Sequence, residues 1–370
     1  MFGVLEMASN LTIYSADDAG LTWPPESTQT GITNDGQRGY YGLYEILKAC
    51  LVDGYTGKAG AGWSFVYDEI AAGTGYRYAL TNQAQTGVMC IEPKSLSYWD
   101  PIVKVCDSAL SPDDLVNDWG GDRSVAHGSA GTVDHFMTLP HSSINWNKSD
   151  TRFLKFILLA TENSFYLHCY PTAYGQTLNS ANSTSYHCSF YCGAAFFSDA
   201  LFSGENPALG NFIVCGGNRS NSAYSGASSA MYQYGQSHSM ATTFLRHFNG
   251  SMRTNSPYGV SYLWHFIKSS SEMPYKYAED LEGIDFSALI PATLIEKTSS
   301  SGTRGNPLCV LPVFLDMFHP SGNALGKLLP GADFKAPVML PDGLEYMALF
   351  VDEAYNTTVN FVPIAASRWP

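Results

Sequence analysis

Residues 40–64 read Y-Y-G-L-Y-E-I-L-K-A-C-L-V-D-G-Y-T-G-K-A-G-A-G-W-S and predict a short amphipathic helix followed by a glycine-rich turn. The apolar positions of its first half recur at i, i+3, i+4, i+7 and i+8, on one face of a helix over residues 40–53: Leu43, Ile46, Leu47, Cys50 and Leu51. Gly54 follows the last of these turns, where a glycine can take the left-handed conformation that ends a helix. The turn then leads to Trp63, a large side chain suited to anchoring the helix on a sheet.

Most of the remaining sequence predicts short strands joined by turns, because the chain holds 34 Gly, 19 Pro and 23 Tyr. The strongest signal is a hairpin of residues 153–161 and 164–170, with Glu162 and Asn163 at the turn. Further strands are predicted at residues 11–14, 65–68, 76–80, 87–91, 100–105, 186–197, 211–215, 260–268, 307–318, 344–351 and 358–364. The expected fold class is mainly β, a β-rich α+β protein. Its antiparallel sheets or β-sandwich layers carry a short amphipathic helix near the N-terminus.

The length of 370 residues exceeds that of one usual domain, so several units are expected. Residues 1–39 are predicted to form a strand and a polar arm that gains its order from a partner. Residues 40–215 are expected to form a β-rich core domain with the helix at 40–53 and an irregular loop at 111–149. Residues 216–258 are predicted to be a Ser/Tyr/Gly-rich interfacial segment, and residues 259–370 a C-terminal β-rich domain.

Composition argues against several classes of function. A net charge of −13 disfavours nucleic-acid binding, which is driven by neutralisation of phosphates with Lys and Arg. The charged fraction is 14%, below the roughly 25% of ordinary soluble domains, which indicates a surface covered by neighbours or rich in Ser, Asn, Gly and Tyr. No stretch approaches the roughly 18 apolar residues of a membrane span. Residues 1–9 lack the features of a secretion signal, so synthesis in a cytosol is expected.

The densest set of potential metal ligands is His168, Cys169, His187, Cys188 and Cys192. Cys188 and Cys192 share a face if they lie on a strand. Zinc sites usually carry tighter Cys-x-x-Cys pairs, so buried free thiols are the preferred interpretation. A disulfide formed after release from the cell remains open, because sheet neighbours can come within bridging distance.

Asp134 and His135, with His127 and His141 nearby, offer the residue types of a hydrolytic triad. The G-x-S-x-G elbow that would position a serine nucleophile is missing. A loop that carries histidines is therefore the preferred interpretation.

Two carboxylate pairs, Asp113 with Asp114 and Glu279 with Asp280, could serve glycoside hydrolysis only if they faced each other across a groove. Residues 216–220 lack the lysine and the glycine spacing of a phosphate loop. No catalytic, cofactor-binding or metal site is predicted, and no cofactor is expected. One weak sign of protein or glycan binding is a set of tyrosines among Ser, Gly and Gln: Tyr224, Tyr232 and Tyr234.

Several segments resemble a family of structural proteins from the particles of tailed bacteriophages. The helix segment L-Y-E-I-L-K-A-C-L-V-D-G-Y (residues 43–55), closed by A-G-W-S (61–64), is similar to that family's amino-terminal signature. N-W-N-K-S (145–149) then precedes the hairpin with F-Y-L-H (165–168), in the order also found there. L-G-K-L-L-P-G (325–331) is a looser match. The resemblance covers the chain in patches from about residue 40 to its end.

This resemblance implies a virion component without enzymatic activity, attached to the tail, neck or baseplate and assembled in the bacterial host cytoplasm. Its expected partners are other virion proteins and copies of itself, with no nucleic acid and no membrane. Two alternatives are a receptor- or glycan-binding tail protein that contacts the host surface, and a capsid decoration protein. A glycan-cleaving enzyme ranks behind them.

Overall fold

The computed structural model describes fourteen stretches of the chain, and all structural statements below concern these residues. They are residues 8, 10–23, 35–95, 98–118, 154–171, 188–197, 212–216, 242–245, 261–262, 289–295, 307–316, 337–339, 343–352 and 358–370. The helical elements in them are α1 (Asp35–Leu47), the π-helix η1 (Lys48–Asp53), α2 (Glu69–Ala72) and the 3-10 helix η5 (Ala366–Arg368). In these stretches no helix is long and apolar enough to cross a membrane.

The described strands form three antiparallel sheets. The five-stranded sheet has the order β2 (Ser64–Asp68), β3 (Tyr78–Thr81), β4 (Val88–Ser95), β5 (Tyr98–Ser111), β6 (Asp114–Asp118). The six-stranded sheet has the order β1 (Thr12–Ser15), β7 (Leu154–Ala160), β8 (Ser164–Pro171), β9 (Cys188–Gly193), β11 (Ile213–Gly216), β12 (Thr242–Leu245). The third sheet runs β13 (Ser261–Tyr262), β14 (Leu289–Ile295), β15 (Pro307–Asp316), β18 (Thr358–Pro363), β17 (Glu345–Asp352), β16 (Pro337–Met339), and β10 (Phe196–Phe197) pairs with β15. The β-rich α+β fold predicted from the sequence is confirmed.

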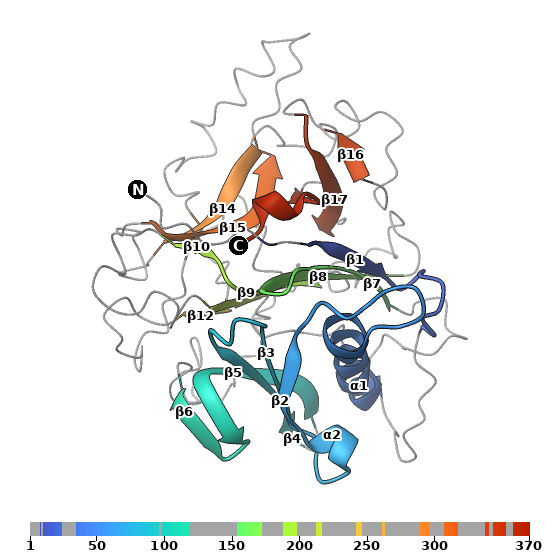
Figure 1. The fold of residues 1–370 in the computed structure, drawn as a ribbon, viewed down its shortest axis with the longest axis vertical. Helices are drawn as coiled ribbons and strands as arrows, with labels where there is room; N and C mark the ends of the chain where they lie inside the picture. The colour runs from blue at the N-terminus through green and yellow to red at the C-terminus, as the bar shows by residue number, and fades with distance from the viewer. Residues whose placement is uncertain are drawn as a thin grey trace.

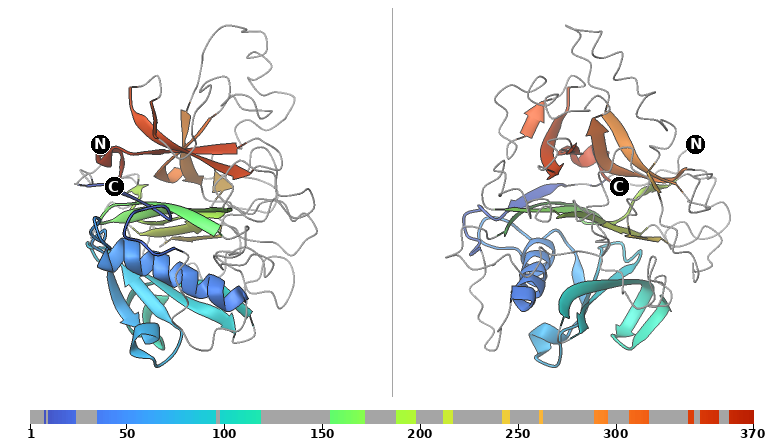
Figure 2. Two further views of the ribbon diagram at one scale, coloured as in Figure 1. Left: turned by 90° about the vertical axis from the view of Figure 1, so that its right-hand side faces the viewer. Right: turned by 180° about the vertical axis from the view of Figure 1, so that it is seen from behind.

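The six-stranded sheet lies in the middle of a layered molecule (Figures 1 and 2). The sheet of β13–β18 covers one of its faces, and α1 with the five-stranded sheet lies on the other. The alternation of β7 reflects this position. Phe156 and Leu158 join the core toward α1, whereas Ile157 and Leu159 join the core toward the third sheet. A strand covered on both faces reads as a continuous apolar run, which is why residues 154–160 (L-K-F-I-L-L-A) gave so strong a signal.

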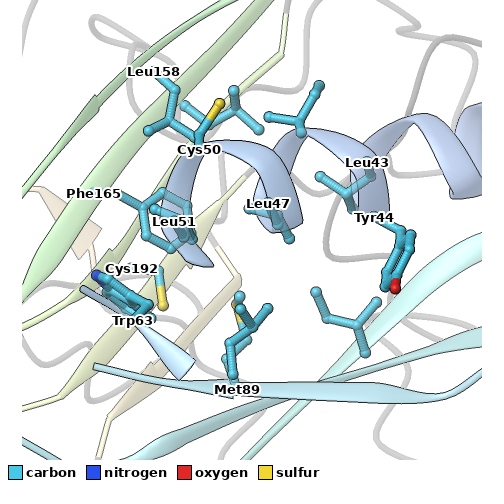
Figure 3. Close-up of a cluster of buried hydrophobic side chains, with 14 of the residues drawn as sticks. Leu43, Tyr44, Leu47, Cys50, Leu51, Trp63, Met89, Leu158, Phe165 and Cys192 are labelled. Atoms are coloured by element: carbon cyan, nitrogen blue, oxygen red, sulfur yellow. The ribbon is translucent and has the colours of Figure 1, made fainter. Parts of the chain in front are cut away.

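The predicted helix is present, and its apolar face is buried as expected (Figure 3). The helix begins five residues earlier than predicted, at Asp35, and its last turn widens into the π-helix η1. Periodicity alone did not indicate this widening, because an α-helix and a short π segment place the same apolar residues on one side. All five predicted positions are at most 1% exposed: Leu43, Ile46, Leu47, Cys50 and Leu51.

The glycine-rich turn brings residues 61–64 tightly back onto η1. The amides of Ala61 and Trp63 donate to the carbonyl oxygens of Cys50 and Leu51, at 3.0 and 3.1 Å. A Cβ at Gly60 would lie 2.3 Å from the carbonyl oxygen of Val52, so this close approach requires glycine. The turn therefore delivers Trp63 into the space between two sheets.

Strand β1 extends the edge of the six-stranded sheet, and a partly buried polar network fastens it to the turn after η1. The Asp18 carboxylate accepts hydrogen bonds from Tyr55 and, at 2.6 Å, from Lys58. Lys58 also donates to the carbonyl oxygen of Ile13 at 2.6 Å, and the Tyr14 hydroxyl donates to that of Ala59 at 2.7 Å. Burial acts to raise the pKa of Asp18, but the hydrogen bonds from Lys58 and Tyr55 outweigh it and lower that pKa.

The structure corrects the predicted irregular loop at residues 111–149. Strand β5 continues to Ser111, and β6 follows after a turn at Pro112 and Asp113. The aspartates and later glycines of this region are typical of a loop, and β6 contains only two apolar residues, Leu115 and Val116. The sequence therefore did not indicate this strand. Residues 119–149 lie outside the described stretches. Besides β6, three further strands were not predicted: β12, which lies within residues 216–258, β14 and β16.

Candidate functional site

The β5–β6 hairpin ends the five-stranded sheet and is the candidate functional site, as an interaction surface. It lies at the lower left of Figure 1, on the side of the sheet away from α1. Pairing aligns Ala109 with Leu115 and Ser111 with Asp114. Because one residue stands between Ala109 and Ser111 and none between their partners, Leu110 is the extra residue of a β-bulge.

A large apolar side chain points outward at the bulge. Leu110 is 80% exposed, whereas its neighbour Ala109 is buried. Val116 on the facing strand is 41% exposed. The inward side chains of the hairpin pack with the sheet in a small cluster: Ala79, Val88, Cys90, Cys106, Ala109 and Leu115. The hairpin is thus held by one side and offers apolar atoms on the other.

An arginine anchors the tip of the hairpin to the rest of the sheet. The Arg77 guanidinium donates to Asp113 at 2.7 Å and, through two nitrogens, to both carboxylate oxygens of Glu69 at 2.8 and 3.1 Å. The Arg77 amide also donates to Glu69, at 3.0 Å. These hydrogen bonds lower the pKa of Glu69 and raise that of Arg77, because each charge stabilises the other. A bidentate pair fixes orientation as well as charge, so Asp113 is held in place.

The anchor is itself tied to the main core. Glu69 opens α2, and the preceding Asp68 caps this short helix by accepting from the Ala71 amide at 2.9 Å. The other oxygen of Asp68 accepts from the hydroxyl of Tyr44 on α1, at 2.7 Å. A chain of polar contacts therefore runs from α1 through α2 and Arg77 to the hairpin. The outward apolar side chains sit on a fixed support.

The hairpin is acidic. Residues 105–118 contain four aspartates and neither lysine nor arginine: Asp107, Asp113, Asp114 and Asp118. Asp113 shares Arg77 with Glu69, which leaves a net negative charge there, and Asp114 is exposed at the start of β6. The surface therefore combines apolar contact area with negative charge.

A second group of titratable side chains lies on β4 and β5 of the same sheet. The sulfur atoms of Cys90 and Cys106 are 3.8 Å apart, and Lys104 and Glu92 form an ion pair at 3.0 Å. Burial, followed by the neighbouring Cys90, raises the pKa of Tyr67, so this phenol stays protonated. Among the residues whose placement is described, no three His, Cys, Asp or Glu side chains gather as a metal site would require.

The structure separates the cysteine and histidine residues that the sequence placed together. Cys169 and Cys192 are buried in the core toward α1 and form no disulfide, and burial raises the pKa of Cys192. His168 is buried and lies opposite Ile157 in the ladder, while Cys169 faces the other way. Cys188 pairs with Cys169 in the backbone register. The thiol interpretation therefore holds for Cys169 and Cys192, and His187 lies outside the described residues.

The other sequence candidates are mostly beyond the described stretches. Asp113 and Asp114 end up apart in role, one bound to Arg77 and one exposed, so they do not face each other across a groove as a pair of hydrolytic carboxylates would. Gly216 ends β11. The candidates outside the described stretches are His127, Asp134, His135, His141, Asn218, Arg219, Ser220, Tyr224, Tyr232, Tyr234, Glu279 and Asp280.

Sequence reasoning missed the hairpin surface altogether. The only signal was the pair of apolar residues Leu115 and Val116 between aspartates, which is too short to indicate a strand by itself. The exposed Leu110 stands at a bulge, and the bulge is visible only in the register of the paired strands.

Comparisons with known proteins add no relative. No protein-family model matches the chain, and searches of curated proteins and of solved structures return no match.

Proposed function

We propose that this chain is a non-enzymatic structural protein of a tailed-bacteriophage virion, present in multiple copies in the tail, neck or baseplate. The observation that carries the proposal is where the segments with the phage resemblance lie. The Trp63 ring, from A-G-W-S, packs against Phe165, from F-Y-L-H, with ring centroids 5.1 Å apart. Leu51 of the helix segment joins the same cluster (Figure 3). Segments that are 100 residues apart in sequence thus form one packed unit, as the core of a shared fold does.

Two further features support an assembly role. The charged fraction of 14% is low for a surface that faces only water. The β5–β6 hairpin adds exposed apolar residues on a rigid support, which suits contact with a neighbouring subunit. In a particle, closed symmetry repeats such modest contacts many times.

A nonsense allele of the gene, in the phage that encodes it, tests the proposal. In a host that does not suppress the allele, we expect lysates with incomplete particles by electron microscopy and few infectious ones. Expression of the wild-type chain from a plasmid restores complete particles. Complete, infectious particles assembled without the chain would overturn the proposal.

A further inference from the structure

We propose that the β5–β6 hairpin is a docking site for a protein strand that is apolar and positively charged. This inference rests on the proposed function, in which the strand belongs to a neighbouring virion protein. Three observations carry it: the bulged Leu110, the outer edge of β6 that no described strand pairs with, and the acidic charge of residues 105–118.

The outer edge of β6 can accept a further strand. Strand β6 is five residues long and is last among the described strands of its sheet, so its outer amide and carbonyl groups can pair with an added strand. At the other end of this sheet, the chain entering β2 is bonded to η1 through the Trp63 amide. Strand β16 ends the third sheet, is three residues long and begins with Pro337, which blunts an edge. Strand β6 contains no proline.

Leu110 and Val116 provide an apolar contact surface on the hairpin. Leu110 is the most exposed of the large apolar residues in the described part of the chain, at 80%. The aspartates of β6 and the bulge beside it would by themselves protect this edge from nonspecific pairing, and neither requires an outward leucine. Leu110 and Val116 together offer the apolar centre that a docked strand requires.

The negative charge of the hairpin determines which kind of strand it attracts. Asp114 is exposed, and Arg77, the cation beside the tip, is already engaged by Glu69 and Asp113. A second copy of this chain has a net charge of −13 and is repelled on approach, whereas a strand with Lys or Arg is attracted. The complementary occupant is therefore a basic, apolar segment of another protein.

Polar contacts fix the hairpin to the rest of the sheet. The bonds from Arg77 to Asp113 and Glu69 hold the hairpin before the partner arrives. Binding then costs less ordering of the hairpin, which favours affinity from a small surface.

The test uses the full-length protein and a labelled peptide of alternating valine and lysine, with a matched peptide of alternating valine and glutamate. Fluorescence anisotropy measures binding, and amide hydrogen exchange shows where the peptide lies. We expect the lysine peptide alone to bind, more weakly as salt rises, and to protect the amides of β6. Leu110→Ser and Asp114→Asn each weaken binding, by about tenfold for Leu110→Ser, the loss expected for one central contact.

Two control variants match these changes elsewhere on the surface. Met339→Ser removes an apolar side chain that is 58% exposed on β16, and Asp53→Asn removes a half-exposed carboxylate at the end of η1. Both are expected to bind the lysine peptide like the wild type. Unchanged thermal midpoints show that Leu110→Ser and Asp114→Asn fold normally.

Three outcomes would overturn the docking proposal. They are equal binding of both peptides, protection elsewhere than β6, and equal binding by Leu110→Ser and Met339→Ser. Concentration-dependent self-association in sedimentation, lost in Leu110→Ser, would assign the hairpin to a second copy and also reject the basic partner. None of these results touches membership of the virion, which particle composition measures separately.

Discussion

The indole nitrogen of Trp63 donates a hydrogen bond to the backbone carbonyl of Thr161 across 3.1 Å, 98 residues away in sequence. Trp63 leads into the five-stranded sheet, and Thr161 follows β7 of the central sheet. This contact ties together the two sheets on which the proposed function depends.

Replacing Trp63 tests that tie. Trp63→Ala is expected to lower the free energy of unfolding by about 3–5 kcal/mol, because it empties a buried aromatic site. Trp63→Phe keeps a ring beside Phe165 but leaves the Thr161 carbonyl without its indole donor, at a cost of about 1–3 kcal/mol. Urea unfolding measures both. A Trp63→Phe variant as stable as the wild type contradicts the role given to the hydrogen bond.

Two tyrosines whose rings pack against each other, Tyr44 and Tyr78, give a second prediction. The Tyr78 hydroxyl is fully buried and has no hydrogen-bond partner in the structure, so Tyr78→Phe is expected to be neutral or stabilising by up to about 1 kcal/mol. The Tyr44 hydroxyl donates to Asp68 at 2.7 Å, so Tyr44→Phe costs about 1.5–3 kcal/mol. Both changes remove one oxygen from rings 5.1 Å apart. Equal effects on urea unfolding would show that the two hydroxyls are not distinguished by their partners.

The anchor of the hairpin predicts a dependence on pH. Arg77 lowers the pKa of Glu69 below its value in the unfolded chain. The contribution of this pair to stability is therefore complete above the unfolded pKa, about 4.3, and is lost as pH falls through the folded pKa. The difference in thermal midpoint between wild type and Glu69→Gln should be largest above about pH 5 and shrink toward acid pH. A difference that grows as pH falls is the opposite of what we expect.

Buried thiols predict slow alkylation. Burial raises the pKa of Cys50 and Cys192, so little thiolate forms at pH 8 and access is blocked as well. Iodoacetamide followed by peptide mass spectrometry should leave both residues unmodified in the folded protein and modify them in urea. Rapid modification of native Cys192 would show that the core around β9 opens readily.

The sequence predicted those parts of the fold that local periodicity determines. The helix face of Leu43 to Leu51 and the hairpin of β7 and β8 were both correct, because their apolar patterns are long and repeated. Strand β6 was missed because its pattern is two residues long. The partners of β1 were not predicted either, since Tyr14 reaches Ala59 only through the folded turn.

The candidate site could not be predicted from sequence, for a related reason. Leu110 is exposed beside a shift of one residue in the register, and Asp113 is held by Arg77, 36 residues earlier. Both facts depend on how the strands of the sheet pair, which local sequence patterns do not show. The pairing of β1 with the central sheet also bears on residues 1–39: their removal deletes β1, with its buried Tyr14, and the start of α1, so it is expected to damage the core.

Quantitative mass spectrometry of purified particles, separated into heads and tails, tests most directly whether this chain is a structural part of a tailed-phage particle. We expect the chain to be enriched with tails, at a small multiple of three or six copies per particle. Hundreds of copies with the heads would make it a capsid decoration protein. Absence from both fractions would contradict the structural role.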